Sequence, residues 1–287
     1  MNKEPNKGKL RYAFFGTPPL TLPLLDTLSE QGLPPLLVVS TPDRPRGRGM
    51  ELMRPPSALW AEEHGIPLLQ PDKLTPEFVE SLKVYDLDLI LVVAYGKILP
   101  QSLIDLPPFG IYNVHYSLLP RWRGATPVES AILHGDSQTG VTIQKMAFEL
   151  DAGAIVRQES VTVFPTETTP ELRDRLNMIA RDILPETLLA IYEGKATFTP
   201  QRNEEATYCK KIEKGEGLII LSDDPLGNYR KYRTYFGWPG SYFFIEKNSK
   251  QIRVLIKKAS LEDGAFMIER VVPEGKKEMD YKAFLSA

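Results

Sequence analysis

Short apolar runs that alternate with helix-like stretches constrain this fold more than any other feature of the chain. The apolar runs occupy residues 10–15, 36–40, 87–93 and 110–114. Helix-like stretches lie between them, such as residues 57–64 and residues 75–83, where Thr75 is placed as an N-cap and Pro76 as the first helical residue. Nearly unbroken apolar strands that alternate with helices are typical of a parallel sheet covered on both faces. We therefore predict an α/β domain built on a mostly parallel sheet.

The rest of the chain, from about residue 168 onward, has a different pattern. A helix is predicted over residues 168–193, with a kink at Pro185, and it closes the first domain. Residues 194–206 are polar and aperiodic, and short aromatic and β-branched runs follow, such as residues 242–245 and 252–256. Such runs indicate a small β-rich domain. We predict a catalytic domain over residues 1–193, a linker over 194–207 and a second domain over 208–287.

Charge and cysteine content exclude several classes of protein. The chain has 287 residues and a formal net charge of -2, which is typical of an ordinary soluble globular protein. From residue 208 onward it carries 15 Lys and Arg against 11 Asp and Glu, a pattern that fits either an acidic partner such as nucleic acid or a mixed solvated surface. Cys209 is the only cysteine, which excludes an internal disulfide. We expect a cytoplasmic monomer that is neither secreted nor membrane-spanning.

Three polar residues in two separate segments predict an active site. Asn113 and His115 lie two residues apart at the end of the fourth apolar run, so they share one face of an extended strand. Asp151 lies in a glycine-bearing turn after the strand-like residues 141–148. An amide that polarises a carbonyl, an imidazole that handles a proton and a carboxylate fit acyl transfer without a covalent intermediate. A purely structural role for a single histidine at a strand end is the alternative reading.

Other kinds of site are disfavoured by motifs that the sequence lacks. It contains no Gly-x-Ser-x-Gly elbow, no G-x-G-x-x-G dinucleotide fingerprint and no G-x-x-x-x-G-K-[ST] phosphate loop. His64 and His134 have no partner at a metal-ligand spacing, so no metal is expected. The predicted chemistry therefore depends on side chains and substrates alone.

A basic loop and two further arginines predict contact with phosphate. Residues 41–49 place Arg44, Arg46 and Arg48 in a Pro- and Gly-rich loop that suits neither a helix nor a central strand. The guanidinium fork matches phosphate oxygens, so we interpret this exposed loop as one that binds a nucleic-acid backbone, with a solvated loop as the alternative. Arg121 and Arg123 lie close to the predicted active site, and we expect them to contact the same nucleic-acid strand.

At these motifs the chain resembles the methionyl-tRNA formyltransferase family, within the wider group of enzymes that use 10-formyltetrahydrofolate. The matching segments are residues 15–18, 41–49, 93–96, 98–100, 113–127, 135–136, 139–142, 150–153, 238–239 and 273–279. The combination of Asn113, His115 and Asp151 is specific to formyl transfer from folate. Tyr116 departs from the family, which usually has Gly or another small residue there, and Leu20 replaces a frequent aromatic residue.

The resemblance implies the fold, the substrates and further site residues. It implies a Rossmann-like formyltransferase domain followed by a small OB-type barrel, here shortened, that helps to bind methionyl initiator tRNA. The formyl donor is 10-formyltetrahydrofolate. Its site is formed by main-chain groups near residues 92–95, at the end of the third apolar run, and by the Leu-Leu-Pro loop. The expected donor-binding residues are Val92, Ala94, Tyr95, Ser117, Leu118, Leu119 and Pro120.

Two rival functions stay open at this point. A sugar-nucleotide N-formyltransferase shares the folate site and the Asn-His-Asp set, but it has no need of the arginine loop or of the basic segment 273–279. A non-catalytic RNA-binding module on an inactive enzyme fold is disfavoured because all three catalytic positions are present. Binding of a folate analogue discriminates the inactive module from both enzymes.

Overall fold

The computed structural model describes residues 9–46, 50–247 and 250–286, and they form a mixed α/β protein. The chain divides into two compact units that do not follow chain order. Unit 1 comprises Met1–Arg123, Gly140–Ser160 and Arg175–Thr207, and unit 2 comprises Gly124–Thr139, Val161–Asp174 and Tyr208–Ala287. The catalytic domain over residues 1–193, the linker over 194–207 and the second domain over 208–287 stay predictions.

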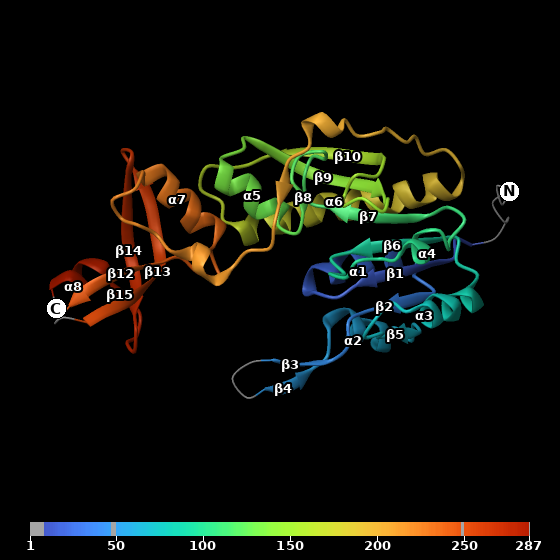
Figure 1. The fold of residues 1–287 in the computed structure, drawn as a ribbon, viewed down its shortest axis with the longest axis horizontal. Helices are drawn as coiled ribbons and strands as arrows, with labels where there is room; N and C mark the ends of the chain where they lie inside the picture. The colour runs from blue at the N-terminus through green and yellow to red at the C-terminus, as the bar shows by residue number, and fades with distance from the viewer. Residues whose placement is uncertain (1–8, 47–49, 248–249, 287) are drawn as a thin grey trace. The chain divides into compact units, whose positions relative to one another are not determined.

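A seven-stranded sheet carries the larger part of the fold (Figure 1). In spatial order its strands are β10 (Ile155–Thr162), β9 (Gln138–Lys145), β7 (Ile111–His115), β6 (Leu89–Val93), β1 (Tyr12–Gly16), β2 (Leu37–Val39) and β5 (Leu68–Leu69). The pairs from β7 to β5 are parallel, and β9 joins β7 antiparallel. The predicted mostly parallel sheet is confirmed.

The apolar runs form the central strands because both faces of the sheet are covered. Every residue of β1 and of β6 is buried. One face packs Phe15 of β1 and Ile90 of β6 against Val79 and Leu103 in one apolar cluster. Burial on both faces removes the alternation of polar and apolar residues, which is why these runs read as continuously apolar.

The helices match several predicted boundaries. They are α1 (Leu22–Glu30), α2 (Pro56–Glu63), α3 (Pro76–Ser81), α4 (Gln101–Ile104), α5 (Pro127–His134), α6 (Thr169–Tyr192), α7 (Pro225–Thr234) and α8 (Tyr281–Ser286). The Thr75 hydroxyl accepts a hydrogen bond from the Phe78 amide at 3.3 Å and caps α3 as predicted. Helix α6 continues through Pro185.

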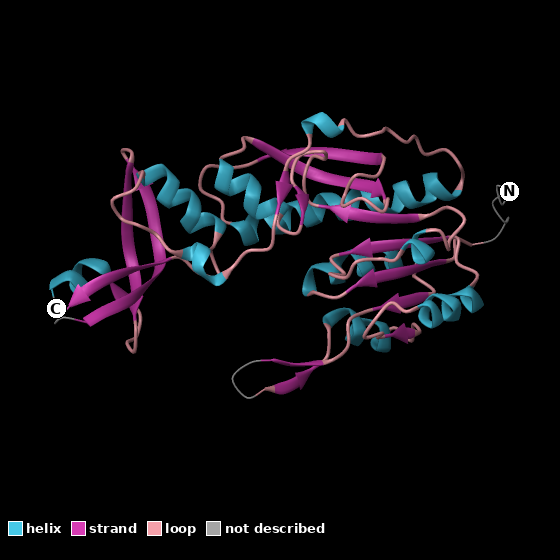
Figure 2. Ribbon diagram, in the orientation of Figure 1, coloured by secondary structure: helices cyan, strands magenta, loops and turns pink. Residues whose placement is uncertain are grey.

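Unit 2 contains an antiparallel sheet in the order β12 (Tyr242–Lys247), β13 (Lys250–Glu262), β14 (Ala265–Pro273) and β15 (Met279–Asp280) (Figure 2). Its apolar cluster joins Val254 and Val271 of the sheet to Tyr232 of α7 and Phe284 of α8. The predicted β-rich character of this segment is confirmed. Two further strand pairs complete the fold: β3 (Arg44–Arg46) with β4 (Glu51–Met53), and β8 (Arg123–Gly124) with β11 (Tyr208–Cys209).

Candidate active site

The carboxyl end of β7 carries the first two predicted catalytic residues. Asn113 pairs with Val92 of β6 on one side and with Gln144 of β9 on the other. Its side chain is half-buried and makes no hydrogen bond to the residues that the structure describes, so its amide remains open to a ligand. His115 ends the strand and is 5% exposed. Functional groups at the carboxyl end of parallel strands are typical of open α/β sheets.

The structure brings Asp151 to His115 across 36 residues of chain. The Asp151 Oδ2 atom lies 3.7 Å from His115 Nδ1. His115 Nε2 lies 2.9 Å from the Trp122 carbonyl oxygen. A carbonyl only accepts hydrogen bonds, so Nε2 carries the proton and donates it, which leaves Nδ1 of the neutral ring facing the carboxylate. The gap of 3.7 Å is longer than a hydrogen bond, and a proton donor between the two groups would bridge it.

Burial decides the charge of His115. Removal from water lowers the pKa of its imidazole below the ordinary value of 6.5, while the Asp151 carboxylate and the bond to the Trp122 carbonyl oppose that shift. Desolvation is the largest of these effects, so the ring is neutral at pH 7. This arrangement suits a group that accepts a proton during the reaction.

Asp151 is held by a glutamine that sequence reasoning missed. Gln144 Nε2 donates to Asp151 Oδ1 at 2.8 Å, so the other carboxylate oxygen is left to face His115. Asp151 has a φ of 48°, a left-handed conformation that residues other than glycine rarely adopt. Gln144 is 1% exposed, but β9 carries polar residues along its whole length, so its sequence gives no sign that this glutamine is buried beside Asp151.

A second glutamine clamps the turn that carries Asp151. Gln201 Nε2 donates to the carbonyl oxygens of Asp151, at 2.8 Å, and Gly153, at 2.7 Å. Its Oε1 atom accepts from Arg123 Nε at 3.0 Å and from Arg123 Nη2 at 2.8 Å. The guanidinium therefore fixes which end of the amide faces the turn. Gln201 lies in the polar segment 194–206, where no local pattern singles it out.

These contacts correct the prediction that Arg123 binds tRNA. Arg123 is 2% exposed, and besides Gln201 it donates from Nη2 to Asn203 Oδ1 at 2.8 Å. A guanidinium that is buried and bonded in this way is not open to a phosphate chain. Arg121, by contrast, is exposed, and its guanidinium lies 4.5 Å from the centre of the Trp122 ring.

The predicted donor-binding loop is fixed by a hydrogen-bond network. The Thr142 hydroxyl donates to the Ser117 carbonyl at 2.6 Å and accepts from the Leu119 amide at 3.2 Å. Gln158 Nε2 donates to the Leu119 carbonyl at 3.0 Å, and the Ser117 hydroxyl donates to the Arg121 carbonyl at 2.6 Å. The Leu119–Pro120 peptide bond is cis. The loop is thus shaped by the protein itself, with Leu118 and Pro120 half-buried.

Of the other predicted donor-binding residues, Val92 lies in β6, and Ala94 and Tyr95 follow the strand directly. Val92 is 6% exposed, whereas Ala94 is exposed and has a φ of 48°. The Tyr95 hydroxyl is buried without a hydrogen-bond partner among the described residues, and burial raises its pKa to about 12. A buried hydroxyl with no partner is costly and favours a role in binding.

Tyr116 and Leu20, the two departures from the family, are joined by α6. The Tyr116 hydroxyl donates to Asn177 Oδ1 at 2.8 Å, and Asn177 Nδ2 donates to the Leu20 carbonyl at 3.2 Å. Tyr116 is 7% exposed and belongs to the core of unit 1. The larger side chain therefore anchors the end of β7 to α6.

The basic segment forms a hairpin rather than the irregular loop expected from its composition. Residues 44–46 are a strand, β3, that pairs antiparallel with β4, and Arg44 is exposed. Arg46 belongs to the same strand, and Arg48 lies outside the described residues. Proline is tolerated here because a two-stranded hairpin has edges on both sides.

Neither a metal-binding cluster nor a membrane-spanning helix is found in the part of the chain that the structure describes. Within residues 9–46, 50–247 and 250–286, no group of three or more His, Cys, Asp or Glu side chains is placed to hold a metal ion. Among the helices in this part of the chain, none combines the length and apolar character needed to cross a membrane.

Comparison with known proteins identifies the family of this chain. The formyl transferase family matches residues 10–188. A methionyl-tRNA formyltransferase from Geotalea daltonii is 40% identical, over 96% of this chain and 95% of its own. The crystal structure of HypX from Aquifex aeolicus in complex with tetrahydrofolic acid has a TM-score of 0.67 at 18% identity, covering 97% of this chain and 47% of that one.

A methionyl-tRNA formyltransferase from Clostridium thermocellum has a TM-score of 0.64 at 18% identity, covering 94% of this chain and 99% of that one. At such identities the structural likenesses establish the fold. Family membership comes from the sequence match, which exceeds 30% identity over nearly the whole chain. The chain belongs to the methionyl-tRNA formyltransferase family.

Proposed function

We propose that this protein transfers a formyl group from 10-formyltetrahydrofolate to the α-amino group of methionyl initiator tRNA. The observation that carries the proposal is the convergence of Asn113, His115 and Asp151, with 3.7 Å between the imidazole and the carboxylate. Membership of the family and a likeness to a tetrahydrofolate-bound structure support the substrates.

Each of the three residues has a distinct task in this proposal. The open amide of Asn113 donates to the oxygen of the reacting carbonyl as negative charge develops there. The neutral His115 and the oriented Asp151 accept the proton that the attacking amine loses when the new carbon–nitrogen bond forms. The bond to the folate nitrogen then breaks, and the proton passes to that nitrogen. A depressed histidine pKa suits a proton acceptor better than a permanent cation.

The donor site is proposed at the residues around this centre. Backbone groups near Val92, Ala94 and Tyr95 would line this site together with the loop from Ser117 to Pro120, whose conformation is fixed by Thr142 and Gln158. The loop includes Leu118 and Leu119, whose side chains supply apolar contact for a ring system. The buried, unpartnered Tyr95 hydroxyl fits a site that receives a polar ligand.

The acceptor site is proposed at the basic hairpin and at unit 2. Arg44, Arg46 and Arg48, together with Arg121, would contact the phosphate backbone. The β-rich segment of residues 208–287 is proposed as an OB-type tRNA-binding domain, with residues 1–193 as the catalytic domain and 194–207 as the linker. Arg123 is not assigned to tRNA binding because its guanidinium donates hydrogen bonds to Gln201.

The test of this proposal is the choice of acceptor. Formyl transfer is measured with methionyl initiator tRNA, methionyl elongator tRNA and an amino-sugar nucleotide, each with 10-formyltetrahydrofolate as the donor. We expect selective formylation of the initiator tRNA. Transfer to the sugar alone would overturn the tRNA assignment, and no transfer to any acceptor would overturn the enzymatic one.

A further inference from the structure

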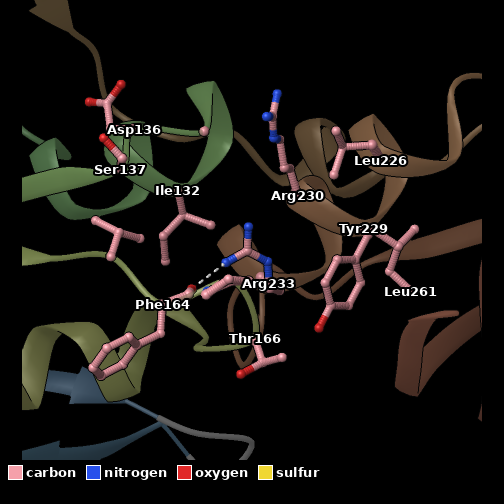
Figure 3. Close-up of a pocket in the computed structure, with 13 residues that line it drawn as sticks. Ile132, Asp136, Ser137, Phe164, Thr166, Leu226, Tyr229, Arg230, Arg233 and Leu261 are labelled. Carbon is pink, nitrogen blue, oxygen red and sulfur yellow. Dashed lines mark hydrogen bonds between the residues drawn. The ribbon is translucent and has the colours of Figure 1, made fainter. Parts of the chain in front are cut away.

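Unit 2 contains a cavity of about 360 Å³ that has no part in the proposed reaction (Figure 3). Its walls come from the end of α5 and the turn after it, the segment 163–166, α7 and β13. The polar lining includes Asp136, Arg230 and Arg233, whereas Ile132, Val163, Leu226 and Leu261 are apolar. This combination of apolar walls and a few polar groups is typical of a small-molecule site.

Arg233 is the unusual residue of this cavity. It is 5% exposed, and Figure 3 shows its guanidinium at the centre of the lining side chains. Nη1 donates to the carbonyl oxygens of Phe164 and Glu167, both at 3.2 Å. Nε is buried without a hydrogen-bond partner among the described residues. A buried donor of a charged group that stays unpaired carries a large desolvation cost.

Arg230, one turn earlier on α7, brings a second positive charge. It makes no hydrogen bond or ion pair with the residues that the structure describes. A β-carbon on Gly135 would collide with its guanidinium, so Arg230 lies against the turn after α5. Burial lowers the pKa of Arg233, and the charge of Arg230 lowers it further, while Tyr229 and Glu167 raise it. The two positive charges therefore repel each other.

Two carboxylates lie near this pair, and neither accepts a hydrogen bond from Arg233 Nε. The Glu167 carboxylate accepts from the Phe164 amide at 2.5 Å. Asp136 lines the cavity, and Figure 3 shows it beside Ser137. The Arg233 guanidinium lies 5.2 Å from the centre of the Tyr229 ring, a contact that stabilises the cation and satisfies no donor.

We infer that this cavity binds a phosphate ester, with the phosphate held between Arg230 and Arg233. Phosphate oxygens match the guanidinium forks, and a phosphate in the cavity would offset the two positive charges. The volume exceeds that of a bare phosphate, and the apolar walls would contact the attached sugar or base. The phosphate belongs either to a free nucleotide or to the backbone of an RNA chain, which share this chemistry.

The binding test uses adenosine 5′-monophosphate as the probe and adenosine as its phosphate-free control, measured by calorimetry on the full chain. Arg230→Gln removes the charge of the more accessible arginine. Lys282→Gln, on exposed α8, is the matched control for net charge. We expect the nucleotide to bind the wild type and Lys282→Gln, and to bind Arg230→Gln at least about tenfold more weakly, as the loss of a charge-assisted hydrogen bond implies. Adenosine should not bind.

The RNA source is tested by the salt dependence of tRNA binding. A backbone phosphate in the cavity predicts that Arg230→Gln lowers the slope of log affinity against log salt by about 1, while Lys282→Gln leaves it unchanged. If Arg230→Gln weakens nucleotide binding but leaves the salt slope of tRNA binding unchanged, the ligand of the cavity is a free nucleotide. The inference is overturned if neither nucleotide affinity nor the tRNA slope depends on Arg230. The RNA source rests on the proposed tRNA-binding role of residues 208–287, but both tests measure binding alone, so their outcomes are distinguishable from a failure of formyl transfer.

Discussion

His115 is the residue whose chemistry depends most on its surroundings. An imidazole in water carries a proton about half of the time near pH 6.5. Here burial favours the neutral form, and the Trp122 carbonyl selects the tautomer with its proton on Nε2. The free lone pair on Nδ1 therefore faces Asp151. Neither preference can be read from the sequence, because Trp122 is seven residues away and its left-handed φ of 62° aims the carbonyl.

Measuring the pKa of His115 tests directly whether its ring is neutral. The chain has three histidines, so an NMR titration of the imidazoles is simple to assign, with His115→Gln identifying the resonance. We expect a pKa below 6.5, and a still lower value in Asp151→Asn, because the carboxylate raises it. The same shift makes the free energy of unfolding depend on pH. Because the pKa of His115 is lower in the folded than in the unfolded protein, His115 favours the folded state above pH 6.5. This stabilisation is lost as the pH falls toward the pKa of the folded state. A titration above 6.5 would contradict the neutral ring.

At the scale of elements, the turn at residues 151–153 is the feature that positions the carboxylate. Gln201 binds two of its carbonyl oxygens, and Arg123 orients Gln201. Gly153 is required because a β-carbon there would collide with the Lys145 carbonyl. The turn is thus fixed by its own geometry and by a clamp from a distant segment.

The hydrogen bonds from Gln201 to this turn predict a specific kinetic effect. Gln201→Ala should lower kcat by about 100-fold, because a shift of about 1 Å in a catalytic group has that effect. KM for donor and acceptor should change little, since Gln201 contacts the turn rather than a substrate. Gln101→Ala, which removes an exposed side chain bonded to Asp105, is the matched control. A wild-type kcat in Gln201→Ala, or an effect confined to KM, would argue against the positioning role.

The β3–β4 hairpin is expected to act on affinity alone. Arg44→Gln should weaken tRNA binding and lower its salt slope by about 1, because one phosphate contact is lost. The rate at saturating tRNA should be unchanged, and Lys83→Gln, an exposed charge in the same unit, should have no effect on either quantity. Binding measured over a series of salt concentrations checks this. An unchanged slope would mean that the hairpin is merely solvated.

For the whole molecule, the sequence predicted what depends on local pattern. The apolar runs at residues 10–15 and 87–93 became β1 and β6, and the helix predicted over 168–193 is α6, Thr169–Tyr192. These elements are strongly periodic or uniformly apolar, so neighbouring residues suffice to identify them.

The rest depended on contacts between distant segments. The antiparallel placement of β9 beside β7 puts Gln144 next to Asn113, and no local signal specifies that pairing. Gln201 reaches the turn at Asp151 from a segment 50 residues away. Arg123 was predicted to bind tRNA because it lies close to the predicted active site, but its partners Gln201 and Asn203 lie about 80 residues further along the chain.

One measurement tests the central claim most directly: single-turnover formyl transfer from 10-formyltetrahydrofolate to methionyl initiator tRNA by the wild type and by Asp151→Asn, with thermal unfolding of both proteins. We predict that the wild type transfers the formyl group. Asp151→Asn should unfold at a similar temperature, since an amide keeps the shape of the side chain, yet react about 100- to 10,000-fold more slowly, the usual contribution of a positioned acid–base group. A folded Asp151→Asn protein with a rate near that of the wild type would contradict the proposed mechanism.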